Sequence, residues 1–251
     1  MKQARLYLCV CILLPLLFCC SSENAWDIVK TKGSYRTETR NIQPFQSLAV
    51  YDGVDVVLEA GTINQVYIEG WSALLPKVQI DVNQQGELTI RDTNGRSLFR
   101  NSSYRTLVHV VYNQQINAIA LYGDGTIVAK DTLQQASYLS ILSENACGSI
   151  NLYLNASNVF VGTNSDNVAD IQLKGELADG LSITSWGNAP IYCDELKTQH
   201  VNLHHYGRGE LHVWAQQTLK AHVFATGSVY YKGNPVVYLE RKGKGNLHHI
   251  P

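Results

Sequence analysis

The sequence predicts an all-β protein whose chain folds as a parallel β-solenoid of short strands, with about 20 residues per coil. Two observations support this prediction. After Phe45, apolar and polar residues alternate in short blocks such as Val54-Asp55-Val56 and Val108-His109-Val110, which is the period of strands with one buried face. No segment keeps the 3.6-residue period of an amphipathic helix, and the second half of the chain repeats.

Composition narrows the classes of partner. The 251 residues carry a formal net charge of −1, so the chain lacks the basic footprint that phosphate binding leaves, and nucleic acid is not an expected partner. Lys, Arg, Asp and Glu together make up only 16% of the residues, while there are 19 Gly and 14 Tyr. This mixture suits many short strands joined by tight turns.

The N-terminus is predicted to be a targeting segment. Lys2 and Arg5 precede the apolar run Leu6–Phe18, whose 13 residues are interrupted only by Pro15. A membrane-spanning helix needs about 20 apolar residues, so this run fits the apolar part of a secretory signal better. We therefore expect residues 1–19 to be a signal peptide.

The residues that follow resemble a bacterial lipobox, in which a cysteine is acylated after cleavage. Leu17 lies three residues before Cys20, so Cys20 is the predicted lipidation site; Cys19 stands where Gly, Ala or Ser is usual. Several acyl chains on Cys20 would hold the protein on a membrane. Ser21 favours the outer membrane, and residues 20–32 read as a tether. The alternative is ordinary signal cleavage with a soluble product.

Seven sets of residues in the second half share a small residue two positions before an aliphatic one. They are Gly125-Thr126-Ile127, Gly148-Ser149-Ile150, Ala169-Asp170-Ile171, Ala189-Pro190-Ile191, Gly209-Glu210-Leu211, Gly227-Ser228-Val229 and Gly245-Asn246-Leu247. Neighbouring aliphatic positions are 23, 21, 20, 20, 18 and 18 residues apart.

A second alternating block lies about ten residues after most of these sets. The blocks are Leu139-Ser140-Ile141, Val159-Phe160-Val161, Leu181-Ser182-Ile183, Val201-Asn202-Leu203, Ala221-His222-Val223 and Val237-Tyr238-Leu239. Two strands per repeat, with turns between them, describe one coil of a solenoid.

Stacking explains the repeat. One repeat is too short to bury its own apolar side chains, but coils stacked about 4.8 Å apart bond to those above and below. Aliphatic residues of equal phase then form an inner file, and Gly supplies the backbone dihedrals that a tight turn needs. A β-sandwich also shows regular strand spacing, but it does not require a small residue at one phase of seven repeats. A single solenoid domain over residues 33–251 is expected.

Several segments resemble the bacterial GIN-domain family, also called the putative auto-transporter adhesin head domain. The matching segments are Gly33-Ser34-Tyr35-Arg36-Thr37-Glu38-Thr39-Arg40 with Phe45 and Val54-Asp55-Val56, then Gly123-Asp124-Gly125-Thr126-Ile127, Gly207-Arg208-Gly209-Glu210-Leu211, Gly227-Ser228-Val229-Tyr230-Tyr231-Lys232-Gly233-Asn234-Pro235 and Gly243-Lys244-Gly245. The resemblance covers residues 33–250 and departs from the pattern at Cys147, Val168 and Asn188. It implies a right-handed parallel β-helix-like fold on an exported protein, often a lipoprotein, whose role is poorly defined.

The repeat alignment predicts that no disulfide forms. Without the signal and Cys20, only Cys147 and Cys193 remain. Cys147 lies in a turn before Ile150, and Cys193 lies two residues after Ile191, at an inward phase. The two cysteines are therefore two coils apart, about 9–10 Å along the axis, whereas bonded Cα atoms lie within about 7 Å. Cys193 is expected to be a buried apolar residue.

The alignment gives no metal or catalytic site. The eight histidines are His109, His200, His204, His205, His212, His222, His248 and His249. We expect His212 and His248 to share an outward file with Tyr192 and Tyr230, and His222 to belong to another with Ser182, Asn202 and Tyr238. Ligands spread in this way do not converge on one ion.

Acidic residues do not pair either. Glycoside hydrolases need two carboxyl groups about 5–10 Å apart. Asp170 and Glu210 share a phase, but Pro190 lies between them in the intervening coil. No cofactor and no catalytic residue are therefore predicted.

Aromatic residues give the candidate binding site. Trp186, Tyr206 and Phe224 occupy one phase in successive coils, with Tyr122 further up the chain. Such a ladder stabilises a solenoid by mutual packing, and it is also a platform for sugar rings. In the second interpretation Tyr192, His212 and Tyr230 on an adjacent face complete the glycan-binding site.

Three functions remain. The first is a binding or adhesion module whose exposed faces contact a glycan or an envelope or host protein. The second is a structural envelope lipoprotein with protein partners only. The third is a glycan-processing enzyme, which the unpaired acids disfavour. Unpaired strands at the ends of the solenoid invite a homo-oligomer, and capped ends are the alternative that the sequence leaves open.

Overall fold

The computed structural model describes residues 33–94 and 105–251. The predicted signal peptide (residues 1–19), the lipidation site Cys20 and the tether (residues 20–32) lie outside the described residues. In the part of the chain that the structure describes, no helix is long and apolar enough to cross a membrane.

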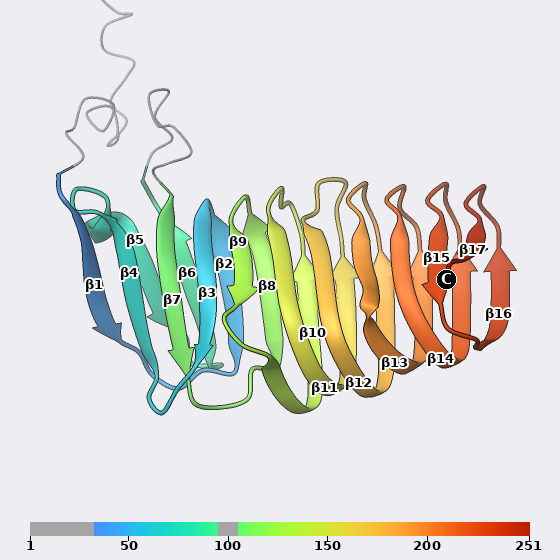
Figure 1. Cartoon of the computed structure of the whole chain (residues 1–251). Helices are drawn as coiled ribbons and strands as arrows, with labels where there is room; N and C mark the ends of the chain where they lie inside the picture. Colours follow the sequence, from blue (N-terminus) through green and yellow to red (C-terminus); the bar gives the residue numbers. More distant parts are fainter. Residues whose placement is uncertain (1–32, 95–104) are drawn as a thin grey trace, which may run out of the picture.

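The described chain is almost entirely β-structure, with one 3-10 helix, η3 (Leu75–Lys77). Its strands join into a single 17-stranded sheet (Figure 1). They are β1 (Tyr35–Asn41), β2 (Ser47–Asp52), β3 (Val54–Ala60), β4 (Gln65–Trp71), β5 (Val78–Val82), β6 (Glu87–Asp92), β7 (Thr106–Tyr112), β8 (Ala118–Gly123), β9 (Thr126–Ala129), β10 (Leu133–Ser143), β11 (Ser149–Thr163), β12 (Asp170–Ser185), β13 (Ile191–His205), β14 (Leu211–Val223), β15 (Val229–Lys232), β16 (Val236–Arg241) and β17 (Leu247–His249).

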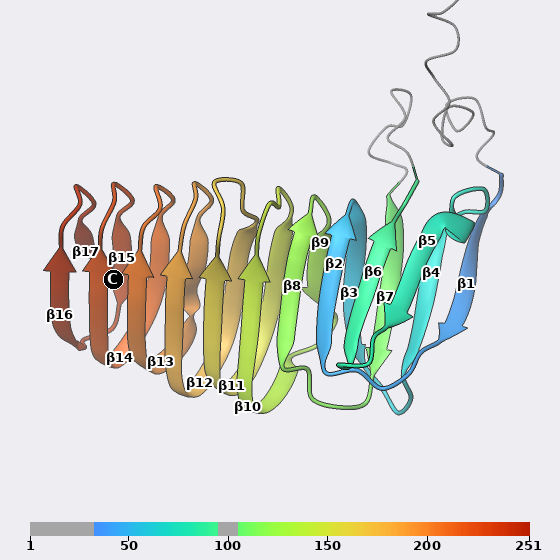
Figure 2. The ribbon, with the colours of Figure 1, turned by 180° about the vertical axis from the view of Figure 1, so that it is seen from behind.

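This sheet winds into a β-solenoid of about six turns, which confirms the predicted fold class. Each long strand from β11 to β14 spans one coil and bends at an irregularity in its pairing. Its first part continues the face formed by β3, β9, β15 and β17, here called the first face. Its last part continues the second face, formed by β2, β8 and β16. The two faces lie on opposite sides of the solenoid (Figures 1 and 2).

The predicted inner file is confirmed residue by residue. Parallel pairing places its seven members next to one another in successive coils: Ile127, Ile150, Ile171, Ile191, Leu211, Val229 and Leu247. The first six are at most 1% exposed, and Leu247 is half-buried in the last coil. Val56 extends the file in the opposite direction. Apolar side chains of equal phase therefore form the continuous core that a single coil could not bury.

The N-terminal third departs from a simple parallel stack. β4 pairs antiparallel with both β1 and β7, and β5 pairs antiparallel with β6. The coil made of β2 and β3 stacks between the strands β6 and β7 on one side and β8 and β9 on the other, so stacking order differs from chain order. The parallel stacking predicted from the repeats therefore does not extend to this end, where the antiparallel strands β1, β4 and β5 close the solenoid.

The recurring small residue has a different cause from the one predicted. Gly125, Gly148, Gly209, Gly227 and Gly245 do not have positive φ. Close contact between coils explains them instead: a Cβ atom on Gly148 would lie 1.8 Å from the carbonyl oxygen of Gly125, and one on Gly245 would lie 1.9 Å from that of Gly227. Glycine allows the turns of adjacent coils to approach this closely.

Both remaining cysteines are free, as predicted. Cys147 is exposed in its turn, and Cys193 is fully buried in the core. Burial raises the pKa of the Cys193 thiol far above its ordinary value. This cysteine therefore behaves as a small apolar core residue.

Candidate functional site

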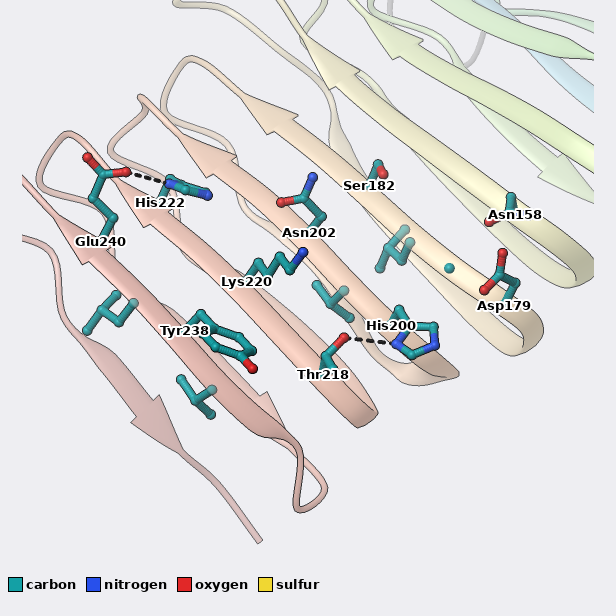
Figure 3. A pocket seen from close by; sticks show the side chains of 15 residues that line it. Asn158, Asp179, Ser182, His200, Asn202, Thr218, Lys220, His222, Tyr238 and Glu240 are labelled. Carbon is teal, nitrogen blue, oxygen red and sulfur yellow. Dashed lines mark hydrogen bonds and ion pairs between the residues drawn. The ribbon is translucent and has the colours of Figure 1, made fainter.

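A groove of about 1150 Å³ lies on the outer side of the second face (Figure 3). Alternation along each strand turns every second side chain outward, and parallel pairing aligns these side chains into files that cross the coils. One file runs through the groove from β12 to β16 and contains Ser182, Asn202, Lys220 and Tyr238. The groove is therefore lined by a hydroxyl, an amide, an ammonium and a phenol side by side.

The position of Lys220 corrects the predicted register. Sequence alignment put His222 in the file of Ser182, Asn202 and Tyr238, but Asn202 pairs with Lys220. His222 instead pairs with His204 on one side and Glu240 on the other. The coil that contains β14 is two residues shorter than the one before it, and the missing residues are at the bend between the two faces. Val201 therefore pairs with Leu219. Spacing alone does not reveal where in the coil the residues are lost.

Hydrogen bonds hold the groove's imidazoles. His200 Nδ1 lies 2.8 Å from Thr218 Oγ1, and His222 Nδ1 lies 2.8 Å from Glu240 Oε2. Lys242 Nζ lies 2.7 Å from the other carboxylate oxygen of Glu240. The Lys242 ammonium, and then His222, lower the pKa of Glu240, so its carboxyl group stays ionised.

The predicted aromatic ladder forms at the border of this groove. The rings of Trp186 and Tyr206 stack with centroids 4.5 Å apart, and those of Tyr206 and Phe224 with centroids 4.7 Å apart. Lys242 Nζ lies 5.4 Å from the centroid of Phe224 and covers the end of the stack. The imidazoles of His204 and His222 stack 4.5 Å apart, and His222 also lies 6.3 Å from Phe224. Ladder and groove are therefore neighbouring parts of one surface.

Stacking limits how the ladder can bind a ligand. Each face of the Tyr206 ring is covered by a neighbouring ring, so only its edge is available. Trp186 is different: it is 47% exposed, and the register that pairs Gly162 with Thr184 places Asn164, not an aromatic residue, on its other side. Tyr122, the further member that the sequence suggested, stacks on Tyr51 in a separate pair with centroids 4.8 Å apart. Trp186 is thus the ring of this ladder best placed to receive a sugar.

Buried polar residues position the turn that carries Trp186. At the inner side of the corner, successive coils place Ser143, Thr163, Ser185 and His205, all at most 2% exposed. The Ser143 hydroxyl accepts a hydrogen bond from the backbone N–H of Ala169 at 2.7 Å. Thr163 bonds in the same way to the backbone of Trp186, and His205 to that of Gly209, so three of these side chains satisfy backbone groups of the turns.

The other predicted glycan contacts lie on the first face. His212 stacks on Tyr230, with centroids 4.7 Å apart, and lies tilted by 47° against Tyr192, with centroids 5.0 Å apart. His248 stacks on the other side of Tyr230 and continues this second ladder. The structure therefore brings Tyr192, His212 and Tyr230 together on the first face, whereas Trp186 follows the second-face part of β12. The two ladders follow different strand blocks of the repeat, and this is the signal that could have separated them.

Within residues 33–94 and 105–251, no three His, Cys, Asp or Glu side chains are placed to hold a metal ion. His109 instead takes part in a charge cluster near the N-terminal end. Its Nδ1 atom lies 2.7 Å from Glu59, which Lys130 also contacts at 3.0 Å. The hydrogen bond from His109, together with Lys130, lowers the pKa of Glu59. This arrangement stabilises a strand surface.

Comparison with known proteins agrees with this fold. A family model described as "Putative auto-transporter adhesin, head GIN domain" matches residues 44–235. No curated protein sequence matches the chain.

Solved structures share the solenoid. A putative adhesin from Bacteroides fragilis superimposes with a TM-score of 0.77 at 21% identity, covering 86% of this chain and 97% of that chain. A putative adhesin from Parabacteroides merdae gives 0.66 at 18% identity, covering 89% and 99%. A putative lipid binding protein from Parabacteroides distasonis gives 0.66 at 16% identity, covering 87% and 98%. At these identities the likeness concerns the fold.

Proposed function

The chain belongs to the family described as "Putative auto-transporter adhesin, head GIN domain", and from this premise we propose that it is a non-catalytic binding module of the bacterial cell envelope. It is exported by the signal peptide of residues 1–19 and anchored to the outer membrane through acylated Cys20, and residues 20–32 tether the solenoid. Its ligand is a glycan that binds on the second face.

One observation carries the choice of ligand: the aromatic ladder that begins with the exposed ring of Trp186 ends at Phe224, beside His222 in the wall of a groove lined by polar side chains. Sugars bind where an apolar ring packs against their C–H faces and hydrogen-bonding groups meet their hydroxyls. Asn202, Lys220 and Tyr238 supply an amide, an ammonium and a phenol in one file beside the ladder. A groove with so many polar groups suits a glycan better than a lipid chain.

The ionisation of Glu240 counts against the glycan-processing alternative. A glycosidase needs a carboxylic acid whose pKa is raised, so that it can protonate the leaving group. The pKa of Glu240 is lowered instead, because Lys242 and His222 both bind its carboxylate. Glu240 is therefore unsuited to be the general acid of a glycosidase, and we propose binding without bond cleavage.

Titration of the lipid-free protein, which begins at Ser21 and is here called the secreted form, with glycans tests this proposal. Neutral and acidic oligosaccharides from bacterial cell walls and host surfaces would be screened by tryptophan fluorescence, and hits quantified by calorimetry. Trp186→Ala should weaken binding about tenfold or more, because the exposed platform is lost. Trp214→Ala is the matched control, since Trp214 lies on the first face. No response to any oligosaccharide, or equal effects of both substitutions, would refute the glycan proposal.

A further inference from the structure

The two ends of the solenoid are built differently. At the N-terminal end, antiparallel strands β1, β4 and β5 cover the core. At the C-terminal end, β16 pairs only with β14 and β17 only with β15 in the part of the chain that the structure describes (Figure 1). The last coil therefore presents open strand edges, which readily pair with another chain.

The open end also exposes core residues. Val237 and Leu239 pair with Leu219 and Ala221, which are both fully buried, and so continue the inner side of the second face. Nevertheless Val237 is 36% exposed and Leu239 47% exposed, because no further coil covers them. Solenoids usually close such an end with a polar capping element. An exposed apolar end of this kind marks an interaction surface.

Backbone groups on this edge are oriented to pair. The Lys242 N–H bonds to the Val223 carbonyl of β14, and the backbone alternates in direction along a strand. The N–H and C=O groups of Val237 and Leu239 therefore point away from β14, toward the open edge. Both residues have their side chains on the inner side, so a strand added here would extend the core as well as the ladder.

We propose that two copies of this chain join end to end by antiparallel pairing of β16 with β16 of the second copy. A two-fold axis at Tyr238 would place Val237 of each copy opposite Leu239 of the other. Both of these pairs would lie on the inner side. The two Tyr238 side chains would meet on the outer side. Identical strands can always pair in this way about a two-fold axis, which gives a closed dimer and leaves no open β16 edge.

The charges of β16 allow a second copy as the occupant, and the position of Arg241 favours this register. With Tyr238 at the axis, Glu240 faces Val236, Arg241 faces Pro235 and Lys242 faces Asn234, so no like charges are opposed. Arg241 lies on the inner side in either register. An axis at Leu239 would put it against Val237, within the strand, where a charge loses hydration. An axis at Tyr238 puts it against Pro235, beyond the end of the strand.

The dimer would also align the two grooves. Paired strands share the faces of one sheet, so both second faces would lie on the same side, with Tyr238 in the wall of each groove. The inference does not depend on the identity of the groove's ligand.

Cysteine cross-linking tests the register. At the axis, the two Tyr238 residues form a non-hydrogen-bonded pair with Cα atoms about 4.5 Å apart, within disulfide range. The two Val236 residues would be offset by four positions, about 13 Å, which is beyond that range. In a Cys147→Ser background, Tyr238→Cys should oxidise to a covalent dimer and Val236→Cys should not. These positions are matched controls, since they are 58% and 59% exposed. Equal cross-linking of both variants, or none of Tyr238→Cys, would overturn the proposal.

Sedimentation of the unsubstituted secreted form supplies an independent measurement. We expect a monomer–dimer equilibrium whose dissociation constant rises about tenfold or more in Leu239→Lys, because each copy would bury a charge. Ile63→Lys, at an equally accessible apolar residue far from the C-terminal end, should leave the equilibrium unchanged. A chain that stays monomeric at every concentration used for cross-linking, or an equal effect of both lysines, would contradict end-to-end pairing. Dimerisation without glycan binding would separate this inference from the proposed function.

Discussion

The hydroxyl of Thr163 holds the backbone of Trp186 by two hydrogen bonds. It accepts one from the Trp186 N–H at 2.8 Å and donates one to the Trp186 carbonyl at 2.6 Å. Thr163 belongs to one coil and Trp186 to the next, so the contact fastens adjacent turns together. It also fixes the position of the most exposed ring of the aromatic ladder.

Replacing this hydroxyl should destabilise the solenoid. Thr163→Val keeps the shape of the side chain but leaves both Trp186 backbone groups without their partner, which should cost about 1–3 kcal/mol. Urea unfolding would measure the loss. Thr184→Val is the control, because Thr184 lies on the outer side of the second face. Equal stability of the two variants would show that Thr163 does not anchor the turn.

The inner core was predictable from the sequence, but the order of the first coils was not. Ile150, Ile171 and Ile191 follow a small residue at a constant offset, so their alignment can be read from spacing alone. The antiparallel strand β4 carries the same period-2 alternation as the parallel strands. Alternation reports which side chains are buried, and it does not report strand direction or partner.

Substitution of an inter-coil glycine should be strongly unfavourable. A Cβ atom on Gly148 would overlap the Gly125 carbonyl at 1.8 Å, so Gly148→Ala forces two backbones apart and should cost about 1–3 kcal/mol or more. Gly180→Ala is the matched control: its φ is not positive, and its Cβ would lie 3.1 Å from the Asn158 side-chain oxygen and 3.6 Å from the His200 carbonyl oxygen, without overlap. Thermal unfolding should show a large shift for the first variant and a small one for the second. Similar shifts would mean that coil spacing is not what requires Gly148.

The two thiols should react at very different rates. In the form that begins at Ser21, Cys147 is exposed and Cys193 is buried with a raised thiol pKa. A thiol-specific reagent should therefore modify one cysteine in the native protein and two in denaturant. Cys147→Ser should abolish the native reaction, and Cys193→Ala should leave it unchanged. Rapid native modification of Cys193 would contradict the packing of the core around it.

The aromatic ladder was predictable, whereas the groove beside it was not. Trp186, Tyr206 and Phe224 share a phase that lies close to the turn, where the repeat is easiest to align. Lys220 belongs to the groove only because the coil loses two residues at the bend before it. A deletion of two residues at a bend does not change the alternation of apolar and polar residues in the strands on either side. The pairing of Asn202 with Lys220 can therefore be seen only in the structure.

Acid should weaken the fold through His205. This imidazole is fully buried in the corner, with its Nε2 atom 2.9 Å from the Gly209 carbonyl oxygen, and burial lowers its pKa below 6.5. The unfolded chain then binds a proton more readily than the folded one. Stability is therefore complete above about pH 6.5 and falls as the pH drops below it, by at most about 1.4 kcal/mol per pH unit.

Denaturant unfolding between pH 8 and pH 5 measures this loss. His205→Gln retains an N–H donor but does not titrate, so its stability should change less over the same range, even if it is lower at pH 8. Glu59 and Glu240 also have lowered pKa values, but they affect stability only below about pH 4.5, where carboxyl groups become protonated. They therefore do not contribute between pH 8 and pH 5. An identical pH dependence in His205→Gln and the unsubstituted protein would assign the acid sensitivity to another group.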